Sequence, residues 1–81
     1  MKKYIMTSNT YFANKSYTFY GIALFVEEKG QLEVLEEYNC LTNDDLQVKH
    51  LVTLCNELDL QQSDFRSVVE DFLVTVKNIN M

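Results

Sequence analysis

Residues 17–28 read YTFYGIALFVEE, and this run decides the predicted fold. Aromatic and β-branched residues dominate it, which favours a β-strand. Lys29-Gly30 follows it, and a similar run then occupies residues 31–40, as expected for two strands joined by a hairpin turn. Because the first run is apolar at consecutive positions, it is typical of a strand with apolar side chains on both faces. It therefore predicts the middle strand of a sheet.

A third strand is predicted on the N-terminal side, over residues 3–12, with a turn at residues 13–16. Two-residue loops at Asn14-Lys15 and at Lys29-Gly30 would pair Tyr4 with Phe25 and Phe25 with Val34. This register gathers aromatic and small side chains on one face, where helices can pack. That predicted face holds Tyr4, Met6, Phe12, Tyr17, Phe19, Gly21, Ala23, Phe25, Val34, Tyr38 and Cys40.

Helical periodicity replaces the strand pattern after residue 41. The polar run TNDD at residues 42–45 can cap the first free N–H groups of a helix. Apolar residues then recur at helical spacing up to residue 58, and again in a second helix that begins between residues 61 and 63. We expect one α+β domain over residues 1–81: a three-stranded antiparallel meander (1–40), then a two-helix hairpin (42–78) packed on one sheet face, in the order β-β-β-α-α.

The sheet face that two helices leave uncovered is the main functional clue. A solvated face normally carries polar residues, whereas this one receives apolar residues. A contiguous apolar patch of a few hundred Å² usually indicates a partner. The predicted interface consists of Ile5, Tyr20, Ile22, Leu24 and Leu35. We expect a non-enzymatic interaction or regulatory module, homodimeric through face-to-face sheets in a C2 arrangement, or bound to another protein.

Composition restricts the partners and the compartment. Seven Lys and Arg residues against 12 Asp and Glu residues give a net charge of −5, which disfavours binding to nucleic-acid phosphates. No run of about 18 apolar residues is present for a membrane span. The basic start lacks the apolar segment of a signal peptide. We therefore expect a cytoplasmic protein that contacts neither nucleic acid nor membrane.

No motif in the chain identifies a reaction. His50, the single histidine, lies on the polar side of the first predicted helix and lacks the i+3 or i+4 partners of a helical metal site. Cys40 and Cys55 are predicted to be small core residues with reduced thiols. We expect no catalytic residue, no metal and no cofactor.

Two alternative functions stay open at this point. A row of carboxylates could imitate phosphates toward a basic protein and make the chain an acidic inhibitor of a nucleic-acid-binding protein. That row is Glu27, Glu28, Glu33, Glu36 and Glu37. A small-ligand sensor would instead need a pocket between sheet and helices near Gly21 and Ala23.

Three short segments resemble small uncharacterised bacterial proteins classed as domains of unknown function. These are Tyr20-Gly21-Ile22, Leu51-Val52 with Cys55-Asn56, and VVEDFL at residues 68–73. The resemblance implies a cytoplasmic bacterial origin and no known activity. Because the matching residues are packing residues, it assigns no function to any position.

Overall fold

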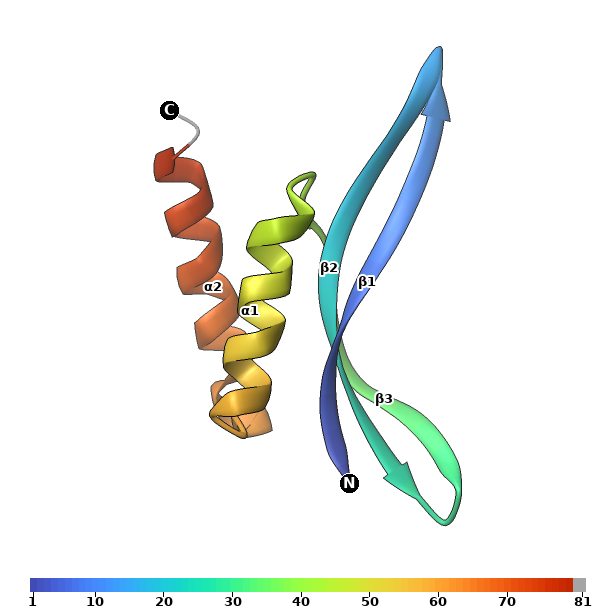
Figure 1. Cartoon of the computed structure of the whole chain (residues 1–81), viewed down its shortest axis with the longest axis vertical. Coiled ribbons are helices and arrows are strands. Elements are labelled where there is room, and N and C mark those ends of the chain that lie inside the picture. The colour runs from blue at the N-terminus through green and yellow to red at the C-terminus, as the bar shows by residue number, and fades with distance from the viewer. Residues whose placement is uncertain (80–81) are drawn as a thin grey trace.

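The fold is α+β, with the predicted order β-β-β-α-α. The structure, a computed structural model, describes residues 1–79. β1 (Lys2–Ala13), β2 (Lys15–Glu28) and β3 (Gln31–Thr42) form an antiparallel sheet in the order β1-β2-β3. α1 (Asp45–Glu57) and α2 (Gln62–Ile79) follow and lie together on one side of the sheet (Figure 1).

The second hairpin has the predicted register next to its turn, from Phe25 to Glu28. Lys29 and Gly30 form its two-residue loop, with φ angles of 54° and 79°. Positive φ at both central residues is the geometry of the tight turns that match strand twist. Phe25 accordingly pairs with Val34, as the sequence predicted.

The first hairpin is shifted by one residue from the prediction. Asn14 alone separates the paired residues Ala13 and Lys15, and it has a φ of 59°. Asn tolerates this left-handed conformation better than most residues do. Tyr4 therefore pairs with Leu24 and not with Phe25.

This shift inverts both faces of β2, because successive side chains on a strand point to opposite sides. The predicted interface residues Ile22 and Leu24 point toward the helices and are fully buried, at 0% exposure. Their prediction as an exposed patch is wrong. The observed register buries two large aliphatic side chains, where the predicted one would have placed Gly21 and Ala23.

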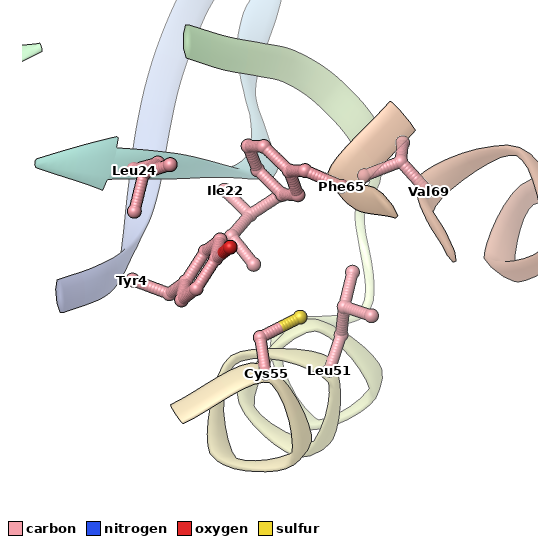
Figure 2. Close-up of a cluster of buried hydrophobic side chains, with 7 residues drawn as sticks. All are labelled: Tyr4, Ile22, Leu24, Leu51, Cys55, Phe65 and Val69. Atoms are coloured by element: carbon pink, nitrogen blue, oxygen red, sulfur yellow. The ribbon is translucent and has the colours of Figure 1, made fainter. Parts of the chain in front are cut away.

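The core lies between the sheet and the two helices. Figure 2 shows the side chains that converge there from β1, β2, α1 and α2. The ring of Phe65 makes edge-to-face contacts with Tyr4 (4.9 Å between centroids) and with Tyr38 (5.0 Å). The buried cluster consists of Tyr4, Ile22, Leu24, Leu51, Cys55, Phe65 and Val69.

Tyr4 joins β1 to the turn between the helices. Its hydroxyl donates a hydrogen bond of 2.6 Å to the carbonyl of Leu60. Burial, with smaller contributions from nearby acidic groups, raises the pKa of Tyr4 to about 12. The side-chain amide of Asn56 forms two further bonds to the backbone of Tyr4, each 2.9 Å long. The C-terminal end of α1 therefore covers the start of β1.

β3 lies unusually close to β2 at Gly21. A Cβ atom there would lie 2.2 Å from the Tyr38 carbonyl oxygen and 2.7 Å from the Asn39 Cα. The register between the two strands also shifts twice, between Tyr20 and Ile22 and between Leu24 and Phe25. Such irregularities bend a strand and increase its twist.

Candidate interaction surface

The side of the sheet opposite the helices carries a partly exposed apolar surface. Ile5 and Leu35 keep their predicted exposure, at 38% and 41%. Tyr20 is half-buried, and its alternation with Ile22 points it to the helix side. Phe25 and Val34, predicted to lie under the helices, belong to the opposite side, because they pair with each other one position from Leu24. We define the open face as Ile5, Phe25 and Val34, together with the exposed Leu35 at the register shift that follows Val34.

The β1–β2 ribbon extends beyond the helices, as Figure 1 shows. β3 pairs with β2 only from Tyr20 onward, so residues 9–19 form a two-stranded projection, which we call the arm. Phe12 is 82% exposed on it, and Tyr11 and Tyr17 are also exposed. An isolated two-stranded ribbon is marginally stable in water, so the arm gains from a further contact.

The predicted position of Phe12, Tyr17 and Phe19 under the helices is wrong. The 14 residues of β2 span about 46 Å, whereas the 13 residues of α1 span about 20 Å. A helix of that length cannot cover the whole strand. Comparing the lengths of the predicted elements would have revealed the uncovered arm.

The charge distribution separates this surface from the rest of the molecule. Lys15 is the single charged residue between positions 4 and 26, although the chain carries 19 charged residues in total. The open face and the arm draw most of their residues from this segment. Their contact with another surface would therefore involve little desolvation of charge.

Cys40 is exposed and not in the core, so its predicted burial is wrong. It takes a φ of 57° in the irregular part of β3, and this turns it away from the helices. Its Sγ atom lies 3.1 Å from the hydroxyl of Tyr11. This hydrogen bond is the main cause of a raised pKa at Tyr11. Cys55 is buried as predicted, and burial raises the pKa of its thiol.

The carboxylates of β3 do not form one uniform row. Glu36 is half-buried and accepts a hydrogen bond from the Tyr38 hydroxyl, which raises the pKa of Tyr38. Gln62 of α2 also donates to Glu36, at 3.4 Å. Glu33 and Glu37 remain exposed. Part of the predicted phosphate-like row is thus bound within the fold.

Among the described residues, neither of the two best-formed pockets is lined by Gly21 or Ala23, where a small-ligand sensor would need one. Ala23 is fully buried, and the backbone of β3 occupies the space beside Gly21. A groove of ≈ 550 Å³ lies instead between the two helices, and the exposed His50 is at its edge. The groove is lined by Gln47, His50, Leu51, Leu54, Val68, Asp71, Phe72 and Thr75.

Nothing in the described residues points to a metal or a membrane span. Residues 1–79 contain no cluster of three or more His, Cys, Asp or Glu side chains that could hold a metal ion. Within the same residues, neither helix is long and apolar enough to cross a bilayer.

Comparison with protein-family models, curated proteins and solved structures found no match to this chain. The resemblance to small uncharacterised bacterial proteins therefore stays a prediction. A functional assignment has to come from the surface itself.

Proposed function

We propose that this protein is a non-enzymatic protein-interaction module that acts as a homodimer. Its contact surface lies within the apolar area that its own helices leave uncovered, which comprises the open face and the arm. The observation that carries this proposal is the total surface of the chain, which exceeds that of a compact monomer of the same mass.

The chain exposes 5901 Å², whereas the usual scaling with mass gives about 5,050 Å² for a monomer of 9.5 kDa. The excess of about 850 Å² is close to the roughly 800 Å² that each partner buries in a standard interface. The radius of gyration, 13.5 Å, likewise exceeds the value of about 11.7 Å expected for a compact domain of 81 residues. Both differences support a subunit that covers part of its surface with a partner.

The charge distribution restricts where a second copy can bind. Each chain carries a net charge of −5, so two copies repel each other over most of their surface. The arm, whose one charged residue is Lys15, and the apolar residues of the open face are where they can approach with little like-charge repulsion. Apolar contacts of this kind predict an affinity that depends weakly on salt or increases with it. An acidic inhibitor bound to a basic protein would instead be released by salt.

Size-exclusion chromatography with light scattering tests the proposal. We expect a mass of about twice 9.5 kDa for the wild type at micromolar concentration. At least one of Val34→Glu on the open face and Phe12→Asp on the arm should shift the species toward monomer. Val74→Glu is the matched control, because Val74 is 58% exposed on α2 and lies outside the proposed surface.

Two results would contradict the proposal. One is a wild-type monomer at every concentration up to about 1 mM, the weak end of specific association. The other is a dimer that Val74→Glu disrupts at least as strongly as the more disruptive of Val34→Glu and Phe12→Asp. Circular dichroism of each variant separates lost association from lost folding.

A further inference from the structure

The outer edge of β1 has a definite hydrogen-bonding pattern. The N–H of Tyr4 donates to Asn56 Oδ1, and Asn56 Nδ2 donates to the carbonyl of Tyr4. The backbone groups of Tyr4 thus point away from β2. Because these directions alternate along a paired strand, the backbone N–H and C=O groups of Met6, Ser8, Thr10 and Phe12 also point outward. Within residues 1–79, no strand lies beyond β1 to receive them.

The two edges of the sheet are protected to different degrees. β3 carries Glu33, Glu36 and Glu37, and its pairing with β2 shifts register twice. Charges and bulges of this kind prevent an edge from pairing with another chain. β1 pairs with β2 without interruption from Lys2 to Ala13, and no charged residue occurs between positions 4 and 13. β1 is therefore the edge open to a further strand.

We propose that two copies of this chain pair antiparallel along their β1 edges, with Asn9 of each copy opposite Asn9 of the other. This inference rests on the proposed homodimer and specifies how it is built. In this register Ser8 lies opposite Thr10 of the partner subunit, and Met6 lies opposite Phe12 of the partner subunit. The outward N–H and C=O groups of Met6, Ser8, Thr10 and Phe12 on each copy are then all paired with the other copy.

Asn56 excludes one of the neighbouring registers. Placing Ser8 opposite Ser8 of the partner subunit would pair Tyr4 with Phe12 of the partner subunit, yet the outward groups of Tyr4 are already bonded to Asn56. Placing Thr10 opposite its own counterpart leaves Met6 facing the turn residue Asn14. In the Asn9-centred register, the pairing between the two copies stops at Met6, so the hydrogen bonds between Tyr4 and Asn56 are kept.

The same register explains the exposed aromatic residue at the arm tip. Phe12 is 82% exposed in one copy, and pairing brings it beside the Met6 side chain of the other copy. Each arm also ceases to be a two-stranded ribbon, because the two sheets join into one continuous sheet. The closed twofold arrangement stops at two copies.

Disulfide trapping tests this register. In a Cys40→Ser background, Asn9→Cys places two sulfur atoms across a non-hydrogen-bonded pair, whose Cα atoms lie about 4.5 Å apart and within disulfide reach. Ser8→Cys and Thr10→Cys are matched controls, because their counterparts lie diagonally, about 7–8 Å apart. Under mild oxidation we expect Asn9→Cys to form covalent dimers at least about tenfold faster than either control.

A second measurement does not depend on added cysteines. Thr10→Pro removes an outward N–H that the β1–β2 hairpin does not use, and edge strands tolerate proline there. We expect the Thr10→Pro chain to be a folded monomer, with a helical circular dichroism spectrum like that of the wild type. A folded Thr10→Pro variant that dimerises like the wild type would overturn the edge pairing.

The outcomes also separate this inference from the proposed function. Val34→Cys reports on face-to-face contact through the open face. Faster cross-linking at Val34 than at Asn9 would refute the edge pairing and leave a homodimer. Fastest cross-linking at Ser8 or Thr10 would refute the register. A monomeric wild type would refute the proposed function itself.

Discussion

Substituting Gly21 tests whether β3 packs against β2 as closely as described. In Gly21→Ala the new methyl carbon would lie 2.2 Å from the Tyr38 carbonyl oxygen, about 1 Å inside an ordinary carbon–oxygen contact. Because the obstacle is backbone, no side-chain rotation relieves it. β3 has to move away from β2, or the ladder between them has to break.

We expect Gly21→Ala to lower the free energy of unfolding by about 3 kcal/mol, the upper end of the usual range for overpacking. For a domain of this size the free energy of unfolding is on the order of 4 to 12 kcal/mol in total. The melting temperature should fall by roughly 12–24 °C. Gly30→Ala is the matched control, since nothing lies within 4 Å of its new methyl group. Gly30→Ala should lower the free energy of unfolding by only about 1–2 kcal/mol, because Ala is less favourable than Gly at the left-handed φ of 79°.

Urea denaturation followed by circular dichroism measures both variants, at one fixed protein concentration because association adds to apparent stability. The reasoning is refuted if Gly21→Ala is as stable as the wild type, or loses no more stability than Gly30→Ala. Either result would mean that β3 does not lie against Gly21 as described.

Three further predictions concern the contacts of β1 and the thiols. The raised pKa of Tyr4 favours its neutral form in the folded state, so its stabilisation is complete below pH 10 and is lost as the pH rises from 10 to about 12. Urea midpoints at several pH values should show this loss of stability in the wild type and a smaller loss in Tyr4→Phe. At pH 7, Tyr4→Phe should lower the free energy of unfolding by about 1 kcal/mol, because the hydrogen bond to Leu60 is removed. Asn56→Ala should lose about 1–3 kcal/mol in the same assay, since two hydrogen bonds to Tyr4 disappear; a loss below about 0.5 kcal/mol would contradict their importance. A thiol reagent at pH 8 should modify Cys40 in the folded protein and Cys55 only in denaturant, and equal rates for both would argue against the burial of Cys55.

Much of the fold could be predicted because its signals are local. The stripe that includes Phe65 and Val69 predicted α2, and both residues are buried. The Lys29-Gly30 turn predicted the second hairpin with the correct pairing, because its backbone geometry depends on those two residues. These features need no information from distant parts of the chain.

The candidate site was less predictable, because it depends on which face of β2 the helices cover. Of the five predicted interface residues, Ile5 and Leu35 are on the exposed surface, whereas Ile22 and Leu24 are in the core. The difference arises at Asn14, where the sequence predicts a two-residue loop and the structure has a tighter turn. A difference of one residue there exchanges the two faces along the whole strand.

The sequence by itself determined the five elements, their order and the position of the second turn, because periodicity and turn chemistry act over a few residues. Only the tertiary structure decided the register of the first hairpin and the exposure of the arm. Both alternatives at Asn14 are locally acceptable for this chain. The choice between them depends on which side chains fill the space beneath α1 and α2. Ile22 and Leu24 fill it better than Gly21 and Ala23 would, and that space exists only once the helices have packed.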